Sequence, residues 1–301
     1  MIHIVGHTAV DHISRVHHLP EKNTSTHIIS RETFFGGGAA NIAAGIAVLG
    51  EKATLVSCVG SDFAGSEYDL WMKKIDIRQQ FFLVPGIHTP TAFMYTDESG
   101  AQMTFFEWGA SKAFATAEAP SLPFVHMATA DPEFNCRVAE KGEFVSFDPG
   151  QDVFWYTKAQ LESILANTDI LFANQHEVKH MCRTLGISRK ALVAQVSMAI
   201  FTMSGDGSML YADGTDHFIP VVPVTLTDPT GAGDAYRAGF LSAYVKGYAP
   251  LTCGQIGTVT ASFVVEHPGC QTHLPTWEMM LTRYRRYFGE PAVPEQGRHS
   301  P

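Results

Sequence analysis

The residues best suited to chemistry lie in one short stretch, Asp228–Asp234, which reads Asp-Pro-Thr-Gly-Ala-Gly-Asp and runs directly into an apolar, helix-favouring segment. Gly231 and Gly233 flank Ala232, so the backbone can turn tightly and approach a ligand. We expect these three amides to lie unpaired at a helix N-terminus, where the helix dipole favours an anion. A carboxylate at Asp234 repels an anion, which suggests a base that takes a proton from a hydroxyl while the anionic group rests on the amides. The pattern predicts phosphoryl transfer to an alcohol.

A second glycine-rich stretch, Gly36–Asn41, precedes an alanine-rich helix expected over residues 39–49. Gly37 and Gly38 again allow close backbone approach to a ligand. Asn41 falls in the first helical turn, where its side chain reaches either the backbone or a substrate hydroxyl.

Asp11 follows the first expected strand, residues 2–6, and we place it in a loop. A carboxylate just past an inner strand is well positioned to hold two hydroxyls of a sugar. Alone it is equally well explained as a turn residue.

Asn174 and Glu177 begin an expected helix directly after the strand at residues 170–172. Their spacing of three places both side chains on one side of the first turn. Such a pair either caps the helix or lies beside a hydrated magnesium ion, and the residues alone leave both open.

The elements that would position these residues alternate regularly. Short apolar runs separated by helical stretches are typical of a parallel sheet covered on both faces. Two further runs, residues 91–96 and 101–107, flank the turn at 97–100 and predict a hairpin that interrupts this alternation. We assign the hairpin and residues 26–34 to a small β-sheet lid. The apolar runs are residues 54–59, 124–128, 144–147, 170–172 and 199–203, with a later hairpin at 208–211 and 217–221.

The lid hairpin is unusually aromatic, which a small sheet does not require. Packing within the lid or against a second subunit explains most of these side chains, and stacking on a planar ligand would explain one or two. The residues concerned are Phe93, Tyr95, Phe105, Phe106 and Trp108.

Composition narrows the class of protein. The chain has 301 residues, of which 45% are hydrophobic and 17% charged, as in ordinary globular proteins. A net charge of −9 argues against nucleic acid or an anionic membrane as a partner. No apolar run is long enough for a membrane span and no secretory signal is evident, so we predict a cytoplasmic protein. Five scattered cysteines predict free thiols, and the histidines, with His12, His17 and His18 in an expected loop, follow no metal-binding pattern.

A lone Gly-x-Gly-Asp run would be read as an ordinary helix cap. The whole stretch from Asp228 to Asp234, however, resembles the C-terminal motif of the PfkB, or ribokinase-like, carbohydrate kinases, and Gly36–Gly50 resembles their N-terminal motif. This resemblance implies an α/β fold, a three-layer sandwich with a mostly parallel central sheet and a small β-sheet lid. We expect one kinase domain over residues 1–301, with the lid formed by about residues 12–34 and 88–109.

The same resemblance assigns the nucleotide end of the site. It implies ATP as co-substrate and Mg²⁺ held through water by Asn174 and Glu177. It implies nucleotide contacts from Asn174, Thr202, Gly207 and Thr230, although Met203 and Ser204 depart from the usual pattern of that segment. In several relatives the residue matching Asp228 helps to bind a monovalent cation, and use of K⁺ by this chain stays open.

The finer sequence resembles archaeal broad-specificity nucleoside kinases over nearly the whole chain, for example in residues 6–11, 131–135, 146–152 and 269–277. This implies transfer of the γ-phosphate of ATP to the 5′-hydroxyl of inosine, guanosine, cytidine or adenosine. By analogy Asp11, Gly37, Gly38 and Asn41 hold the ribose. From its position and its amide we add Gln151 as a contact to the base.

Other classes of function fit less of the sequence. A ribokinase- or fructokinase-type sugar kinase shares every motif and is the alternative. A silent ligand-binding regulator would be expected to lack the base or the glycines. A dehydrogenase would need Gly-x-Gly-x-x-Gly after the first strand, and residues 6–11 lack it. The expected partners are a nucleoside or sugar and ATP, with a homodimer through the lid left open.

Overall fold

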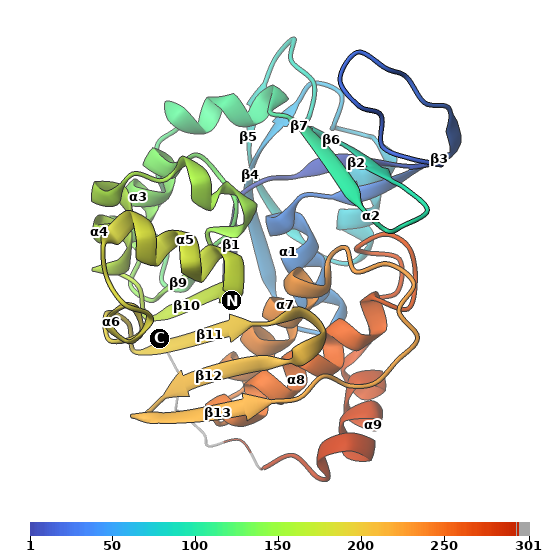
Figure 1. Cartoon of the computed structure of the whole chain (residues 1–301). Coiled ribbons are helices and arrows are strands. Elements are labelled where there is room, and N and C mark those ends of the chain that lie inside the picture. Colours follow the sequence, from blue (N-terminus) through green and yellow to red (C-terminus); the bar gives the residue numbers. More distant parts are fainter. Residues whose placement is uncertain (293, 295–301) are drawn as a thin grey trace.

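A nine-stranded sheet forms the centre of the computed structural model, which describes residues 1–292 and 294 (Figure 1). Its strands are β1 (Ile2–Val5), β4 (Ala53–Gly60), β5 (Arg78–Val84), β8 (Val125–Met127), β9 (Val145–Phe147), β10 (Ile170–Asn174), β11 (Met198–Thr202), β12 (Ser208–Ala212) and β13 (Thr215–Ile219). They lie in the order β13-β12-β11-β10-β9-β8-β1-β4-β5. From β11 to β5 all neighbours are parallel, whereas β12 and β13 extend one edge antiparallel.

Helices cover both faces of the sheet because side chains alternate along each buried strand. In β10, Ile170 and Phe172 belong to one hydrophobic cluster, and Leu171 and Ala173 to the other. The first cluster includes α1 (Gly38–Val48), α2 (Glu67–Lys74), α7 (Ala232–Val245), α8 (Pro250–Val264) and α9 (Trp277–Phe288). The second includes α3 (Pro132–Lys141), α4 (Lys158–Leu165), α5 (Gln175–Leu185), α6 (Arg189–Val193) and the 3₁₀ turns η1 (Gly109–Ala115) and η2 (Gly150–Trp155). A third 3₁₀ turn, η3, spans Ser204–Asp206. The predicted three-layer sandwich is confirmed.

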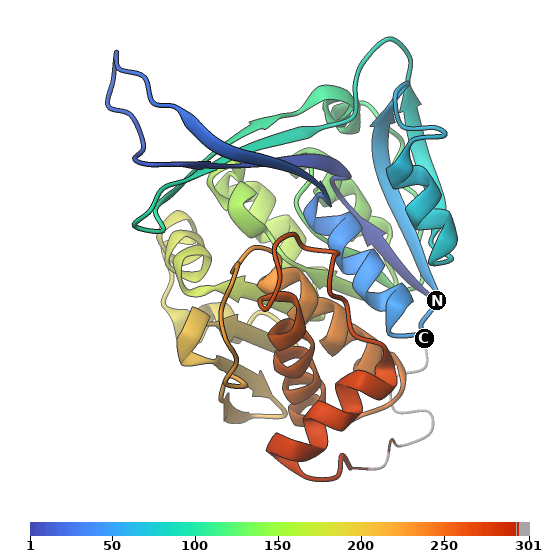
Figure 2. The same cartoon turned by 90° about the vertical axis from the view of Figure 1, so that its right-hand side faces the viewer.

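A separate four-stranded sheet, the lid sheet, extends over one end of the central sheet (Figure 2). It consists of β2 (Ala9–Val16), β3 (Ile28–Gly36), β6 (Thr91–Thr96) and β7 (Gln102–Glu107), in the order β3-β2-β6-β7. The predicted hairpin corresponds to β6 and β7. The assignment of these strands and their flanks to a lid within one domain over residues 1–301 stays a prediction.

Two strands differ from the sequence expectation. Residues around Asp11 and His12 were expected to form a loop, but they belong to β2, which pairs with β3 and β6. The buried positions of β2 include Asp11 and Ser14, so the strand lacks the apolar alternation that would have marked it. Strand β5 was not predicted either, because it begins with the polar run Arg78-Gln79-Gln80 at the sheet edge.

No helix within residues 1–292 is both long and apolar enough to cross a membrane. All five cysteines are free.

Helices α1 and α7 lie in unusually close contact. A Cβ atom added to Gly45 of α1 would lie 2.6 Å from the Cβ of Ala238 in α7. Absence of a side chain at Gly45 therefore lets the two helix backbones approach. Asn41 lies one turn before Gly45, and Asp234 one turn before Ala238, so this contact also sets the distance between the two predicted site residues.

We expect Gly45→Val to force α1 and α7 apart and to destabilise the fold by about 1–3 kcal/mol. Turnover should fall as well, because Asn41 and Asp234 move with their helices. Ala47→Val places the same side chain at a partly exposed position of the same helix and serves as the control. Denaturant unfolding and a kinase assay on both variants measure the two effects. Equal stability and turnover in both variants would contradict this account of the contact.

Candidate active site

A cavity of about 870 Å³ lies between the lid sheet and the carboxyl ends of the central parallel strands. This edge of a parallel sheet is where α/β proteins commonly bind ligands. The cavity brings together fourteen of the fifteen predicted site residues: Asp11, Gly37, Gly38, Asn41, Gln151, Asn174, Glu177, Thr202, Gly207, Thr230, Gly231, Ala232, Gly233 and Asp234. Asp228 is the predicted site residue that does not line it.

The N-terminus of α7 opens into this cavity. Its cap, Gly231, has φ of 80°, and a Cβ there would lie 2.8 Å from the Cβ of Cys270, so only glycine fits the turn. The amides of Gly231 and Gly233 have no hydrogen-bond acceptor in the described part of the chain. The expectation that all three amides are unpaired is wrong for Ala232, whose N–H donates to the carbonyl of Pro229 at 3.2 Å. The left-handed turn at Gly231 directs that amide back along the chain.

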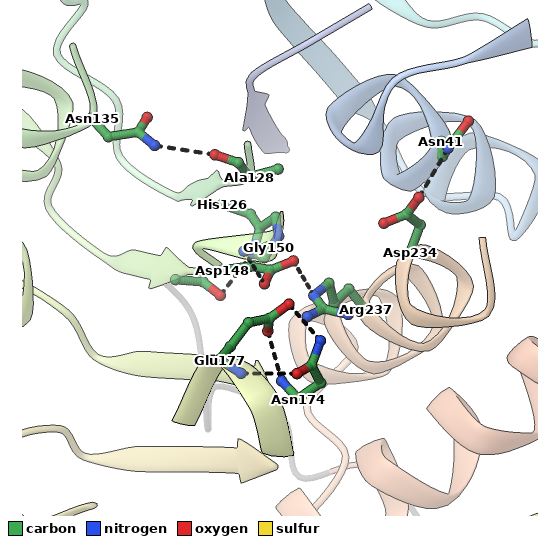
Figure 3. Close-up of polar contacts among 11 residues, drawn as sticks. Asn41, His126, Ala128, Asn135, Asp148, Gly150, Asn174, Glu177, Asp234 and Arg237 are labelled. Carbon is green, nitrogen blue, oxygen red and sulfur yellow. Dashed lines mark hydrogen bonds and ion pairs between the residues drawn. The ribbon is translucent and has the colours of Figure 1, made fainter. Parts of the chain in front are cut away.

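Asp234 lies in the first turn of α7 and faces Asn41 of α1 (Figure 3). Asn41 Nδ2 donates to Asp234 Oδ2 at 2.9 Å. Burial raises the pKa of Asp234 to about 6, and Asp148 adds to this rise, while the Asn41 hydrogen bond and the charge of Arg237 oppose it. At neutral pH the carboxylate is therefore mostly ionised and also more basic than an ordinary aspartate. That combination suits a general base.

Asp11 enters the cavity from β2, where it pairs with Phe34. The side chain is buried, and a Cβ at Gly36 would lie 2.0 Å from its Oδ2, so the glycine makes room for the carboxylate. Burial raises the pKa of Asp11 to about 7, with further contributions from the charges of Asp234 and Asp228. A hydroxyl group that donates a hydrogen bond to this buried carboxylate would stabilise it, which favours binding of a ligand that carries hydroxyls.

Asn174 and Glu177 form a complete capping box at the start of α5 (Figure 3). The Asn174 side-chain oxygen accepts from the amides of His176 and Glu177 at 2.8 and 2.9 Å. The Glu177 carboxylate accepts from Asn174 N at 2.7 Å and Nδ2 at 2.6 Å. Of the two explanations given for this pair, the helix cap is therefore confirmed. Both residues also line the cavity, so the cap does not remove them from ligand chemistry.

The donor set near α5 fits a hydrated magnesium ion better than a directly ligated metal. Burial and the charge of Asp148 raise the pKa of Glu177 to about 7, and Arg237 opposes the rise. No group of three or more His, Cys, Asp or Glu side chains within the described residues is arranged to hold a metal ion. Carboxylate and amide oxygens that reach a cation through its water shell are what Mg²⁺ accepts.

An ion pair between Arg237 and Asp148 was missed by sequence reasoning (Figure 3). Both side chains are buried and line the cavity, and Asp148 also accepts from Gly150 N at 3.1 Å. Burial alone would lower the pKa of Arg237, but the charges of Asp148, Glu177 and Asp234 raise it overall. The sequence places each residue near the site without indicating that the two pair. Arg237 is one helical turn after Asp234, and Asp148 directly follows a buried strand.

His7 and Asp152 form a second polar contact that the sequence did not indicate. His7 is buried, its Nδ1 lies 2.8 Å from Ser111 Oγ, and its Nε2 lies 3.4 Å from Asp152 Oδ2. His7 also packs its ring 4.9 Å from that of Phe106 in the lid sheet. His7, Asp152 and Phe106 line the cavity beside Gln151. Among the five lid aromatics named as stacking candidates, Phe106 is the one that reaches it.

Asp228 connects the loop before α7 to the loop that contains Gly269. Its Oδ1 accepts from Thr230 N at 2.9 Å and its Oδ2 from Gly269 N at 3.2 Å. Gly207 has φ of 101° and a Cβ there would lie 2.3 Å from the carbonyl oxygen of Ile219, so glycine is required at this turn. Of the residues in these loops, Gly207 and Thr230 line the cavity, as does Thr202 at the end of β11.

Comparison with known proteins agrees with this geometry. A model of the pfkB family of carbohydrate kinases matches residues 1–277, and the chain belongs to this family. A nucleoside kinase of Methanocaldococcus jannaschii is 44% identical over 290 residues, which cover 94% of this chain and 96% of that protein. A nucleoside kinase of Methanothermobacter thermautotrophicus is 42% identical over 302 residues, which cover 96% and 97%.

Solved structures extend the likeness to the fold. The crystal structure of the M. jannaschii nucleoside kinase, described as an archaeal member of the ribokinase family, has a TM-score of 0.90 and covers 95% of this chain and 98% of that one. A Burkholderia thailandensis nucleoside kinase in complex with inosine is 25% identical, also has a TM-score of 0.90, and covers 98% and 100%. The predicted family and ribokinase-like fold are confirmed.

The raised carboxylate pKa values predict that activity is lost at an unusually high pH when the solution is acidified. Asp234 has to be ionised to accept a proton, so activity falls as pH drops through about 6. Asp11 and Glu177, each with a pKa of about 7, make the loss of activity begin at a higher pH than Asp234 alone would. We expect the acidic limb of kcat/KM for the acceptor to lie between pH 6 and 7, measured at saturating ATP. Circular dichroism at each pH checks that the fold persists, and full activity retained down to about pH 5 would contradict the prediction.

Proposed function

We propose that this protein is an ATP-dependent nucleoside kinase that transfers the γ-phosphoryl group of ATP to the 5′-hydroxyl of a nucleoside. The observation that carries the proposal is the position of Asp234, whose raised pKa of about 6 suits a base, beside the open amides of Gly231 and Gly233 in one cavity. At about 870 Å³ the cavity lies within the range of about 300–1,000 Å³ that ligand sites occupy. Two nucleoside kinases at 42% and 44% identity support the same activity.

The acceptor would lie beneath the lid sheet. In this arrangement Asp11 and Asn41 receive the ribose hydroxyls, while the backbone at Gly37 and Gly38 approaches the sugar closely. Gly37 has φ of 91°, and a Cβ there would lie 2.5 Å from the carbonyl oxygen of His7, so the approach depends on glycine. Gln151 is the proposed contact to the base.

Side chains beyond the ribose position favour a nucleoside over a bare sugar. The cavity continues past Asp11 to Met94, Thr104 and Phe106 of the lid sheet and to Gln151. A planar base would fill this space, whereas a pentose or hexose would leave it to water. A ribokinase- or fructokinase-type activity remains the second candidate, and turnover of nucleosides, ribose and fructose under matched conditions separates the two.

ATP would occupy the other end of the cavity. Thr202, Gly207 and Thr230 are the proposed contacts to its phosphates and ribose, with Asn174 beside them. Mg²⁺, held through water by Asn174 and Glu177, would neutralise charge on the phosphates. Asp228 is the proposed side chain at a monovalent cation site for K⁺, since it already joins the loops around Thr230 and Gly269.

The reaction follows from these positions. The γ-phosphoryl group rests on the amides of Gly231 and Gly233, which stabilise its charge as it moves. Asp234 accepts the proton of the 5′-hydroxyl while the new P–O bond forms and the bond to the β-phosphate breaks, releasing ADP. Closure of the lid sheet over the acceptor excludes water that would otherwise hydrolyse ATP.

The lid sheet is also the proposed surface for a homodimer. Ile28 and Ile29 of β3 are each 50% exposed and Phe105 of β7 is 56% exposed, more apolar surface than an isolated sheet needs. Residues 1–301 would form one kinase domain with this lid, although residues 293 and 295–301 lie outside the described part of the structure.

Asp234→Asn should fold normally and lose kcat by at least about 10²–10⁴-fold, because an amide cannot accept the hydroxyl proton. The asparagine oxygen can still accept from Asn41, so the contact between the helices persists. Asp213→Asn, an equal change of charge in the exposed turn between β12 and β13, is the control. A coupled ADP-release assay measures both variants. Retention of wild-type kcat by Asp234→Asn would refute its role as the base.

Asp11→Ala should raise the KM of the nucleoside about 10–100-fold, because the lost hydrogen bonds to a charged group are worth about 1.5–3 kcal/mol. The KM of ATP should change far less, since Asp11 lies at the acceptor end. Asp11→Asn keeps the volume beside Gly36 and checks for loss of packing. Steady-state kinetics with each substrate varied in turn give both constants. Equal changes in the two KM values would remove Asp11 from the ribose site.

A further inference from the structure

A chain of side-chain hydrogen bonds connects helix α2 to Asp234, and we call it the Gln271 relay. Its members, in order, are Trp71, Gln271, Asn41 and Asp234, with a branch from Gln271 through Tyr68 to the carbonyl of Gly36. Tyr68, Gln271 and Asn41 are buried, so these groups depend on one another for hydrogen bonds.

The Trp71 end fixes the orientation of Gln271. Trp71 Nε1 donates to Gln271 Oε1 at 3.0 Å, and an indole nitrogen can only donate. The carbonyl oxygen of Gln271 therefore faces Trp71, and its amino group faces the other way. There Nε2 donates to Asn41 Oδ1 at 2.9 Å and to the hydroxyl of Tyr68 at 2.7 Å.

The branch through Tyr68 requires the same orientation independently. Tyr68 donates its proton to the carbonyl oxygen of Gly36 at 2.8 Å, and a carbonyl can only accept. Burial raises the pKa of Tyr68 well above its ordinary value, so the proton stays in place. The Tyr68 oxygen is then left to accept from Gln271.

The orientation of Asn41 follows from these two constraints. Its Oδ1 is occupied by Gln271, so its Nδ2 faces Asp234 and donates to Oδ2 at 2.9 Å. In the flipped orientation the Asn41 carbonyl would face the Asp234 carboxylate. Two acceptors would then repel each other, and the charged form of Asp234 would lose a hydrogen bond that favours it.

We propose that Gln271 is a positioning residue for phosphoryl transfer, which holds the amino group of Asn41 toward Asp234 and ties that orientation to Gly36, where the lid strand β3 ends. This inference rests on the proposed role of Asp234 as the base. The loop that carries Gln271 supports it, since a Cβ at Gly269 would lie 2.3 Å from the ring of Phe34 in β3. The same loop packs Cys270 against Gly231, the cap of α7.

Other charged and titratable groups also face Asp234, and a test has to separate them from the relay. They are Asp11 on β2, Tyr68 on α2, Asp148 after β9, Glu177 on α5, Arg237 on α7 and Cys270 on the loop before Gln271. A change at Gln271 that adds no charge leaves the residue types of all six groups unchanged, and of the six only Tyr68 loses a hydrogen bond from Gln271.

The test compares Gln271→Met with Gln271→Glu. Methionine of similar length removes both hydrogen bonds to Asn41 and Tyr68 without adding charge. Glutamate can only accept, so Asn41 has to donate to it and turn its carbonyl toward Asp234. We expect the acidic limb of kcat/KM to move upward in both variants, by about one pH unit for Gln271→Glu, with about a tenfold loss of activity below the limb. The KM of ATP should stay within about twofold of the wild-type value, because no ATP contact is altered.

Two further variants keep the test decisive. Gln255→Met is the matched control, because Gln255 accepts from Tyr284 at 2.6 Å between α8 and α9 and does not line the cavity. It should leave the acidic limb in place. Gln271→Leu, which also has no hydrogen-bonding side-chain group, should shift the limb in the same direction and replaces Gln271→Met if that variant folds poorly. Circular dichroism checks the fold of each.

A double-mutant cycle shows whether Gln271 acts through Asn41. In an Asn41→Ala background, Gln271→Met should produce no further shift of the acidic limb. An unshifted limb in both Gln271→Met and Gln271→Leu, or a full additional shift in the Asn41→Ala background, would overturn the proposal. Asp234→Asn measured in parallel tests the role of Asp234 separately from that of Gln271. If Asp234→Asn retains wild-type turnover, Asp234 is not the base. If Asp234→Asn loses turnover but Gln271→Met leaves the acidic limb of kcat/KM unshifted, only the role of Gln271 is refuted.

Discussion

Five carboxylate residues line one cavity, and the rest of the site is arranged around keeping four of them charged. These four are Asp11, Asp148, Glu177 and Asp234, and Arg237 is the one lysine or arginine that lines the cavity in the described chain. Burial and the charges of neighbouring carboxylates raise the pKa of each of the four. Hydrogen bonds from Asn41 and Asn174 and the ion pair with Arg237 oppose that rise. The net effect is a carboxylate at Asp234 that is ionised at neutral pH but still binds a proton readily, as the proposed base requires.

This electrostatic balance depends on backbone geometry that few side chains permit. Glycine at 45 lets α1 approach α7, which brings Asn41 to Asp234. Glycine at 36 makes room for the Asp11 carboxylate, and glycine at 231 allows the left-handed turn that opens the α7 N-terminus. Through Tyr68 and Gln271 the end of the lid strand β3 is hydrogen-bonded to the same network. The position of β3 and the position of Asp234, the proposed base, are therefore structurally linked.

Local patterns in the sequence predicted part of this arrangement. The alternation of apolar runs and helices predicted the layered sheet, and the glycine-rich stretches before α1 and α7 predicted two backbone segments that line the cavity. Contacts between distant segments escaped prediction. Asp148 and Arg237 are 89 positions apart, His7 and Asp152 are 145 apart, and nothing in either local sequence identifies the partner. Strand β2 was missed for a related reason, since its polar Asp11 and Ser14 are buried only in the folded structure, where β2 pairs with β3 and β6.

The most direct test of the central claim is a crystal structure with a nucleoside and a non-hydrolysable ATP analogue bound together. The account predicts that the acceptor 5′-oxygen lies about 2.6–3.2 Å from a carboxylate oxygen of Asp234, with the γ-phosphate on the amides of Gly231 and Gly233. A 5′-oxygen placed against Asp148 or Glu177 instead, with Asp234 directed away from it, would contradict the account.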